Sequence, residues 1–336
     1  MKISDTQPLN EKTPWLWRPP LPIGNSPLFS WPPQMLRILN HLFGRGFLGS
    51  PRLLYLGLAV ATWQMFGHRL ERSVEFDIGW IAQLYGINLV AVLVVAGGLH
   101  LYFYTLKRQR LALRFDAREQ QTNSPKFVTG DQVRDNMLWT CLSGVTIWTA
   151  FTAAFMWAYA NELIPWLEWP DSPLAVAWFI VLLPLLGLWE SAHFYFIHRL
   201  LHYKPLYRWH VLHHHNINVG PWSGLAMHPL EHVLYFSTIL IHLVLATHPV
   251  HMFFHLYATA LGAVTSHTGY AAVLARDHKP ISLGDFHHQL HHRYFDCNYG
   301  NTEVPLDKWF GTFHDGTAQA TAHVRQFQSQ KRGRRM

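Results

Sequence analysis

Long apolar runs alternate with polar segments along the first 190 residues of the chain. Residues 80–105, 137–158 and 174–190 are each poor in charge and long enough to cross a membrane, since a helical crossing needs about 20 residues. Residues 53–66 form a shorter, moderately apolar stretch before them. This pattern predicts four crossings, and we expect the fourth helix to continue into the first histidine-rich segment.

Two further apolar stretches, 233–247 and 250–266, are separated by Thr247-His248-Pro249. Each is short for a complete crossing. A helical hairpin that enters the membrane from the cytoplasmic side fits best, and two additional crossings are the alternative.

The composition excludes several classes of protein. Charged residues make up only 14% of the chain and aromatic residues 15%, whereas ordinary soluble domains are about 25% charged. A disordered chain would be poor in aromatic residues. The two cysteines, Cys141 and Cys297, are too few for a disulfide scaffold or a cysteine zinc motif. The net charge of +7 does not indicate nucleic-acid binding, because the basic residues lie beside apolar segments.

The charges of the loops predict the orientation in the membrane. The loop at 107–136 is rich in Lys and Arg, as is the C-terminus at 331–335, whereas the loop at 159–173 has neither. The positive-inside rule therefore places 107–136 and the C-terminus in the cytoplasm. Four crossings also return the chain to the cytoplasmic side where the histidines begin. We expect an integral protein of a bacterial inner membrane or the endoplasmic reticulum.

These patterns divide the chain into four parts. Residues 1–50, rich in Pro and Trp, are expected to form an irregular arm whose Trp side chains suit the headgroup level. Residues 51–173 form the transmembrane region, 174–315 a histidine-box domain and 316–336 a basic tail. The expected fold is all-α: an integral membrane helical bundle with a cytoplasmic helical cap that carries a dimetal site.

The 24 histidines are concentrated in the second half of the chain. Their spacing places two or three imidazoles on one face of each of three helical segments, because residues three and four apart are neighbours on a helix. The histidines in question are His198 and His202, then His210, His213 and His214, then His288, His291 and His292.

Eight imidazoles are too many for one metal ion, since a catalytic zinc takes about three protein ligands. Two metal ions are therefore expected. Because adjacent residues on a helix point about 100° apart, each adjacent pair should span both ions. Isolated histidines on apolar faces are more typical of packing, and we assign that role to His242, His248, His251 and His255.

Taken in order, these motifs resemble the sterol desaturase/fatty acid hydroxylase superfamily. The chain has His198-Arg-Leu-Leu-His202, His210-Val-Leu-His213-His214, His228-Pro-Leu-Glu231, His267-Thr-Gly-Tyr270 and His288-Gln-Leu-His291-His292, followed by Asn298-Tyr-Gly300. The resemblance covers roughly residues 175–315, and the N-terminal half matches only in being membrane-spanning.

The resemblance implies a site in which two iron ions are bound almost wholly by imidazole. The implied ligands are His198, His202, His210, His213, His214, His267, His288, His291 and His292. His228, Glu231, His193 and His287 are further ligands or residues that brace the site, and Glu231, Asp285 and Asp296 are candidate acceptors for the Nδ1–H groups of the ligands. Ala271 stands where one branch of the superfamily has another histidine.

The implied activity is that of a membrane-bound monooxygenase or desaturase, an oxidoreductase that uses O2 to hydroxylate or desaturate a lipid. Its substrate would be a sterol, acyl chain, sphingoid base or ether lipid. Electrons would come from a separate donor of the cytochrome b5, ferredoxin or reductase type, and zinc could replace iron in an overexpressed preparation. The alternative is a membrane zinc-dependent hydrolase or a metal-handling protein, although no HExxH motif is present.

Overall fold

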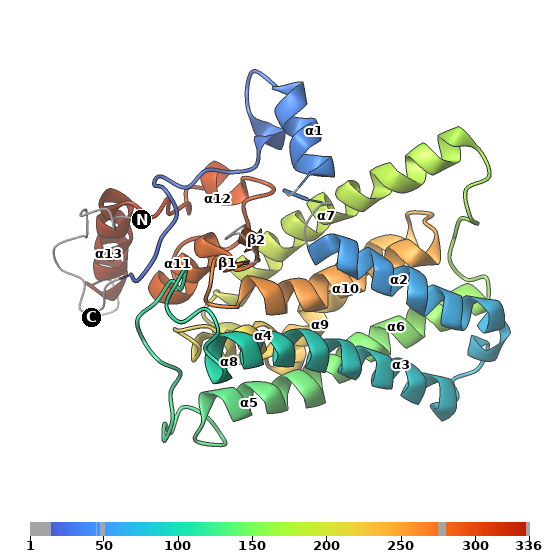
Figure 1. Ribbon diagram of the computed structural model, residues 1–336, viewed down its shortest axis with the longest axis horizontal. Coiled ribbons are helices and arrows are strands. Elements are labelled where there is room, and N and C mark those ends of the chain that lie inside the picture. Colours follow the sequence, from blue (N-terminus) through green and yellow to red (C-terminus); the bar gives the residue numbers. More distant parts are fainter. Residues whose placement is uncertain (1–14, 45, 48–50, 275–279, 334–336) are drawn as a thin grey trace.

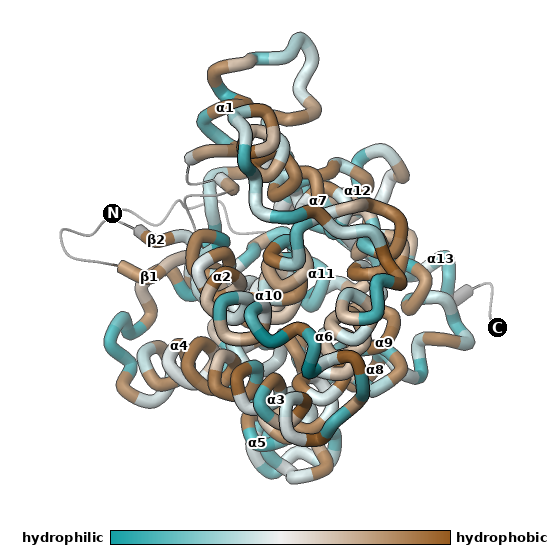
Figure 2. The backbone as a smooth tube through the Cα atoms, turned by 90° about the vertical axis from the view of Figure 1, so that its right-hand side faces the viewer, coloured by the Kyte–Doolittle hydropathy of each residue, from teal (hydrophilic) through white to brown (hydrophobic). Residues whose placement is uncertain are grey.

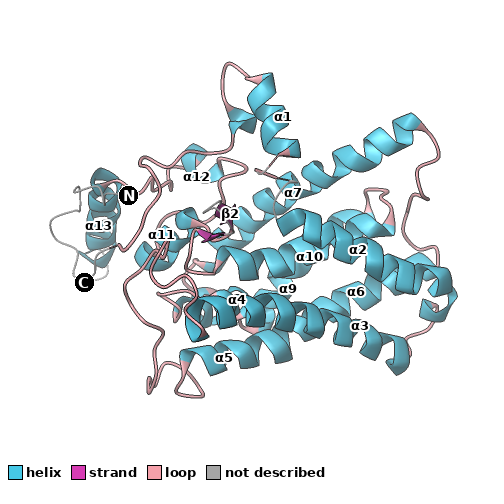
Figure 3. Ribbon diagram, in the orientation of Figure 1, coloured by secondary structure: helices cyan, strands magenta, loops and turns pink. Residues whose placement is uncertain are grey.

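The computed structural model describes residues 15–44, 46–47, 51–274 and 280–333, and these residues are predominantly helical (Figures 1 and 3). Long helices run side by side along the longest axis of the molecule (Figure 1). One two-stranded antiparallel sheet, β1 (Ala272–Leu274) with β2 (Pro280–Ser282), accompanies them in the described part of the chain. The expected all-α class is confirmed.

Between residues 53 and 201 the chain runs along the bundle four times. The four passes are α2 (Leu53–Phe66) with the 3-10 segment η3 (Gly67–Ser73); α3 (Ile78–Val92), η4 (Leu93–Gly97), α4 (Gly98–His100) and η5 (Leu101–Thr105); α5 (Gln132–Leu138), η6 (Trp139–Gly144) and α6 (Val145–Ala160); and α7 (Pro173–Leu201).

The starts of three of these passes are encoded locally. Asp77, Asp131 and Ser172 each cap a helix N-terminus by accepting a hydrogen bond from a backbone N–H of the first turn. Pro173 then occupies the first position of α7, where the missing N–H costs nothing. As predicted, α7 is a single helix that extends beyond the apolar run to Leu201.

Three of the four predicted crossings are long and apolar enough to span a membrane. Among the described residues these are Ile78–Thr105, Gln132–Ala160 and Pro173–Leu201. The remaining predicted crossing, α2, is only 14 residues long. It packs alongside α10 (Pro249–Ser266). The Tyr55 hydroxyl is 3.0 Å from Thr265 Oγ1, and the Thr62 hydroxyl is 2.9 Å from the Tyr257 hydroxyl.

The two later apolar stretches form a hairpin along the bundle. Its first arm is α9 (Pro229–Phe236) with η8 (Ser237–Leu243), and α10 is its second arm. At the tip, Thr247 forms a β-bridge with Trp166, which lies in the acidic loop between α6 and α7. Nearly every residue of α10 is buried, so this helix is the centre of the bundle and its apolar character reflects packing against protein.

The opposite end of the bundle carries the histidines. There lie the C-terminal end of α7, α8 (Tyr207–His214), η7 (Pro221–Leu225), α11 (Phe286–Tyr294) and α12 (Leu306–Trp309) (Figure 1). The helix α13 (Ala318–Gly333), formed by the basic tail, packs on α11 through a hydrogen bond from Gln328 to the Tyr294 carbonyl. Arg114 forms a β-bridge with Tyr270, so the basic loop lies at this end as well.

Two structural features bear on the proposed division of the chain, which stays a prediction. The arm is not wholly irregular, since it contains η1 (Pro27–Phe29) and the helix α1 (Met35–Phe43), with Trp31 90% exposed. Figure 2 shows α1 projecting from the side of the bundle. The boundary at residue 173 does not separate two packing units, because one hydrophobic core runs from Tyr55 to Val264.

Candidate metal centre

The structure brings all nine predicted ligands together, in two adjoining groups. One group contains His198, His202, His210, His214 and His291, and the other contains His213, His267, His288 and His292. Within each group the ligand nitrogens lie within 4.8 Å of one another. Eight of the nine side chains are buried, and His202 is half-buried.

Four helices supply these side chains, which explains the spacing in the sequence. His198 and His202 come from the end of α7, and the second cluster comes from α8. His267 follows the last residue of α10, and the third cluster lies on α11. Each helix therefore presents one face to a common centre.

The nitrogen atoms of the four-histidine group have the spacing expected of ligands around one metal ion. The Nε2 atoms of His267, His288 and His292 form a triangle with all three sides 3.1 Å. Nitrogens bound at ~2.1 Å to one ion at right angles would be about 3.0 Å apart. Hydrogen bonds do not account for three equal contacts, because the Nε2 of a neutral imidazole either donates or accepts, so at least two of the three atoms are of the same kind.

The first group has the same spacing. His198 Nε2 lies 3.1 Å from His210 Nε2, and His214 Nε2 lies 3.0 Å from His202 Nε2 and 3.1 Å from His291 Nε2. The two groups are in contact, since the His213 and His292 rings are 4.7 Å apart and the His214 and His291 rings 4.8 Å. This arrangement can hold two neighbouring ions.

Backbone carbonyls set the tautomers of three ligands. Nδ1 of His198 donates to the Tyr299 carbonyl at 2.6 Å, and Nδ1 of His291 donates to the Cys297 carbonyl at 2.6 Å. His267 Nδ1 lies 2.8 Å from the Ala263 carbonyl. Because a carbonyl only accepts, each Nε2 is left with a lone pair that points into the centre, as metal ligation requires.

Glu231 plays the same part for His210 with a carboxylate. Its Oε1 accepts from His210 Nδ1 at 2.6 Å, and both side chains are buried. The other carboxylate oxygen, Oε2, has no hydrogen-bond partner among the described residues. Of the three acidic residues proposed as acceptors, Glu231 alone contacts a predicted ligand.

The roles expected of Asp285 and Asp296 are wrong. Asp285 caps α11 by accepting from the His287 backbone N–H. Asp296 instead pairs with Lys331 of α13 at 2.8 Å. Both acids are near predicted ligands in the sequence, but the Asp285 side chain caps a helix and the Asp296 side chain pairs with α13.

The remaining candidate histidines stand apart from the two groups. His193 Nε2 is 2.9 Å from Ser237 Oγ. His228 caps α9, where its Nδ1 accepts from the Leu230 N–H. His287 stacks on Phe313, and its Nε2 lies 3.7 Å from Asp307. None of the three lies in a described metal-ligand group.

The histidines assigned to packing are also outside both groups. His242 and His255 contact each other and the hydroxyls of Thr247 and Thr238, inside the hairpin. His251 Nε2 donates to the Phe179 carbonyl at 2.9 Å. Their polar atoms are thus satisfied by protein.

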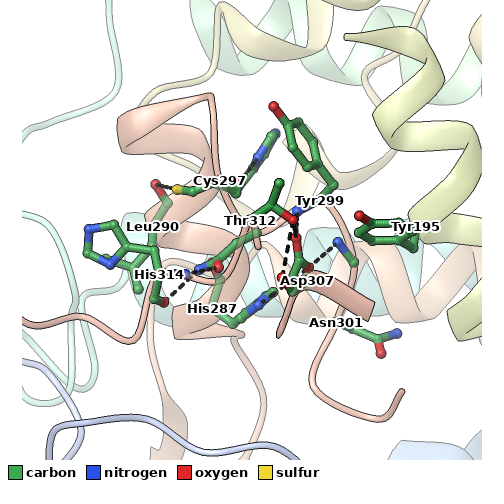
Figure 4. Close-up of polar contacts among 12 residues, drawn as sticks. Tyr195, His287, Leu290, Cys297, Tyr299, Asn301, Asp307, Thr312 and His314 are labelled. Atoms are coloured by element: carbon green, nitrogen blue, oxygen red, sulfur yellow. Dashed lines mark hydrogen bonds and ion pairs between the residues drawn. The ribbon is translucent and has the colours of Figure 1, made fainter. Parts of the chain in front are cut away.

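Asp307 is a supporting residue that the sequence did not reveal (Figure 4). Its carboxylate accepts from the backbone N–H groups of Tyr299 and Gly300 and from the Thr312 hydroxyl. These bonds hold the loop whose Tyr299 carbonyl orients His198. A single Asp in a short helix forms no repeating pattern in the sequence. Its role becomes visible only from its tertiary contacts.

Burial favours the neutral form of the predicted ligand imidazoles. It lowers the pKa of His210, His213 and His214 on α8 well below the usual value, and it does the same to His288, His291 and His292 on α11. Neutral imidazole is the form that binds a metal. Burial also raises the pKa of Glu231.

A cavity of about 310 Å³ opens beside both histidine groups. Its apolar lining includes Phe194, Ile197 and Leu201 of α7 with Met227 and Ala263. Its polar lining includes Glu231 and Asp285 as well as Arg52, Glu190 and Glu303. The cavity can place a mostly apolar molecule against the metal centre.

Comparisons with known proteins agree with this geometry. A family model described as fatty acid hydroxylase matches residues 183–312. Methylsterol monooxygenase 1 of Gallus gallus is 31% identical over 150 residues, which cover 43% of this chain and 50% of that protein. The protein of the same name from Rattus norvegicus is 30% identical over 184 residues, covering 52% and 61%.

A plant relative is named as a desaturase, whereas the two animal relatives are named as monooxygenases. The Delta(7)-sterol-C5(6)-desaturase of Nicotiana tabacum is 31% identical over 126 residues, covering 36% of this chain and 45% of that protein. The matched part thus spans about half the length of these curated relatives, and no solved structure matches the chain significantly. The histidine-rich half of the chain is therefore similar to the fatty acid hydroxylase family and to these sterol-modifying relatives.

Proposed function

We propose that this protein is a membrane-bound oxidoreductase that holds two iron ions and uses O2 to hydroxylate or desaturate a lipid. The observation that carries the proposal is the convergence of nine imidazoles into two adjoining groups at the end of a lipid-sized cavity. The relatives named above modify sterols, so a sterol is the first substrate to test.

The residues present fit two ions. Five imidazoles in one group and four in the other would leave positions for oxygen ligands on octahedral ions, and imidazole suits iron. Bound iron would supply the O2-derived oxidant that an unactivated C–H bond requires. The protein contributes the neutral imidazoles, the carbonyls and Glu231 that orient them, and the apolar walls that hold the chain.

The reaction also needs electrons and protons. Hydroxylation consumes O2, two electrons and two protons, placing one oxygen atom in the lipid and the other in water. Desaturation consumes the same reagents and forms a double bond and two waters. No nucleotide or haem motif is evident in the sequence, so we assign the electrons to a separate donor protein.

The charge distribution supports a cytoplasmic metal end. The basic loop around Arg114 and the basic helix α13 both lie there, while the acidic loop containing Trp166 lies at the other end. By the positive-inside rule, the histidine end would face the cytoplasm, where a soluble or peripheral donor can reach it.

The hydrolase alternative is less well supported. A catalytic zinc takes about three protein ligands, far fewer than the nine imidazoles gathered here. The one buried carboxylate in contact with a ligand, Glu231, is hydrogen-bonded to His210 and so serves as an orienting group.

The function is tested in purified, iron-loaded protein with a chemical reductant and a sterol mixture. We expect O2 consumption that depends on lipid, and a product that has gained one oxygen atom or lost two hydrogen atoms. His213→Ala is the inactive comparison, and His323→Ala, an exposed position on α13, is the matched control. Hydrolysed lipid without O2 consumption would favour the zinc hydrolase.

A further inference from the structure

The helix α7 carries a half-buried acidic residue that has no contact with the predicted metal ligands. Glu190 is the one acidic residue of this membrane-spanning helix. Ionisable residues inside membrane segments are costly and usually have a function. Glu190 is half-buried and lines the cavity that reaches the histidine groups.

The position of Glu190 on α7 is related to that of the metal ligands. Glu190, Phe194 and His198 are spaced four residues apart and line the same cavity, as expected for one helix face. Eight residues of helix rise about 12 Å. The carboxylate and the ligand therefore mark two ends of one lipid-sized space, with an aromatic ring between them.

The groups around Glu190 leave it able to bind a ligand. The Thr259 hydroxyl lies beside it, and the nearest cationic influence is that of Arg52. Arg52 also lies 3.9 Å from Glu303, which in turn contacts His41 at 2.8 Å. Two carboxylates thus share one guanidinium, and the geometry gives Glu190 no ion pair of its own among the described residues.

The charge of this cluster selects the kind of ligand. Arg52 is the one guanidinium beside these two carboxylates and already lies next to Glu303, so the cluster has no spare cation to pair with a fatty-acid carboxylate or a phosphate. A hydroxyl group, by contrast, can donate to Glu190 without bringing a charge into the bundle. An apolar body with one hydroxyl would lie along the apolar part of the lining, which includes Phe194, Ile197 and Leu201.

We propose that Glu190, flanked by Arg52 and Glu303, binds the hydroxyl group of the lipid substrate and so fixes which carbon faces the metal centre. This proposal rests on the lipid-oxidising function proposed above. It makes Glu190 a substrate-positioning residue and the substrate a neutral lipid alcohol, with the hydroxyl at the end of the cavity remote from the oxidised carbon.

The test is equilibrium binding to the full-length, metal-loaded protein in detergent. Two matched pairs of probes are used: cholesterol with 5-cholestene, which lacks the hydroxyl, and 1-octadecanol with octadecane. A hydrogen bond to a charged group corresponds to roughly 10- to 100-fold in affinity. We expect wild-type protein to prefer at least one alcohol over its hydrocarbon by that factor.

The variants are Glu190→Leu, Glu190→Gln and, as a control, Glu168→Gln in the exposed acidic loop. Glu190→Leu should abolish the preference, Glu190→Gln should retain part of it through the amide oxygen, and Glu168→Gln should behave as wild type. All should retain the metal content of wild type, which shows that the variants are folded.

Three results would overturn the assignment: binding of neither alcohol, equal binding of alcohol and hydrocarbon by wild type, or an unchanged preference in Glu190→Leu. None of these bears on whether the protein holds two metals and oxidises a lipid with O2. A failure of the role proposed for Glu190 is therefore distinguishable from a failure of the proposed function.

Discussion

His213 and His214 are adjacent in the chain, yet their imidazoles belong to different nitrogen groups, with ring planes 76° apart. His291 and His292 divide in the same way, with planes 84° apart. Each HH pair therefore joins the two halves of the centre, as the helical geometry of the sequence predicts.

Replacement of either member of a pair should remove one half of the centre. We expect His213→Ala to weaken the four-histidine group and His214→Ala the five-histidine group, so that each variant retains about half the metal of wild type. Both should lose turnover, because the proposed reaction uses both ions. Metal analysis of the purified variants checks this, with His323→Ala as the control; full metal content in His213→Ala would contradict the assignment.

His267 tests whether the residue after α10 is a ligand or a brace. Its Nε2 is 3.1 Å from both His288 and His292, so we expect His267→Ala to lower metal content as well as turnover. A variant with normal metal content and slightly reduced turnover would show that His267 only supports its neighbours. His228→Ala, which removes a helix cap outside the groups, is the comparison.

Glu231 should matter through His210. Glu231→Gln keeps an acceptor for the Nδ1–H of His210 but removes the charge that strengthens the bond, and Glu231→Ala removes both. Outer residues of this kind typically contribute roughly 10- to 100-fold in metal affinity or activity. We expect Gln to be milder than Ala, as measured by metal competition with a chelator; equal affinity in wild type and Glu231→Ala would refute the role.

His314 should make the docking of α13 depend on pH. Its Nδ1 accepts from the Gly316 N–H, its Nε2 contacts the Thr321 hydroxyl, and burial lowers its pKa from 6.5 to about 4. The folded state thus favours neutral His314, so this contribution is complete above pH 6.5 and is lost as the pH falls towards 4. The contribution is roughly 3 kcal/mol at most.

Thermal unfolding of wild type and His314→Gln between pH 7.5 and 5 measures this effect. We expect wild type to be the more stable at pH 7.5 and the difference to shrink on acidification. A difference that stays constant over this range would show that His314 does not titrate on unfolding.

The sequence predicted which imidazoles converge because their spacing is local information. Spacings of three and four on α8 and α11 define helix faces, and the HH pairs define two directions. The shared core of α2 and α10 was not predictable in this way, since it joins residues such as Tyr55 and Thr265 that lie far apart in the chain.

The supporting residues were harder to predict for the same reason. Asp307 acts through backbone N–H groups of Tyr299 and Gly300, and Glu190 lines a cavity to which Arg52 of a different helix region also contributes. Asp285 and Asp296 looked equally suitable in the sequence, but helix capping and pairing with Lys331 occupy them. Histidines three or four residues apart can be assigned to one helix face from the sequence. The carboxylate that accepts from an imidazole Nδ1–H depends on the tertiary fold.

The most direct test of the dimetal assignment is the amount and kind of metal in the protein. The full chain, expressed in iron-supplemented medium and purified in detergent without chelators, should contain two iron ions per chain by elemental analysis. A Mössbauer spectrum should show both in nitrogen-rich sites. One metal ion per chain, or spectra dominated by oxygen ligands, would contradict the account.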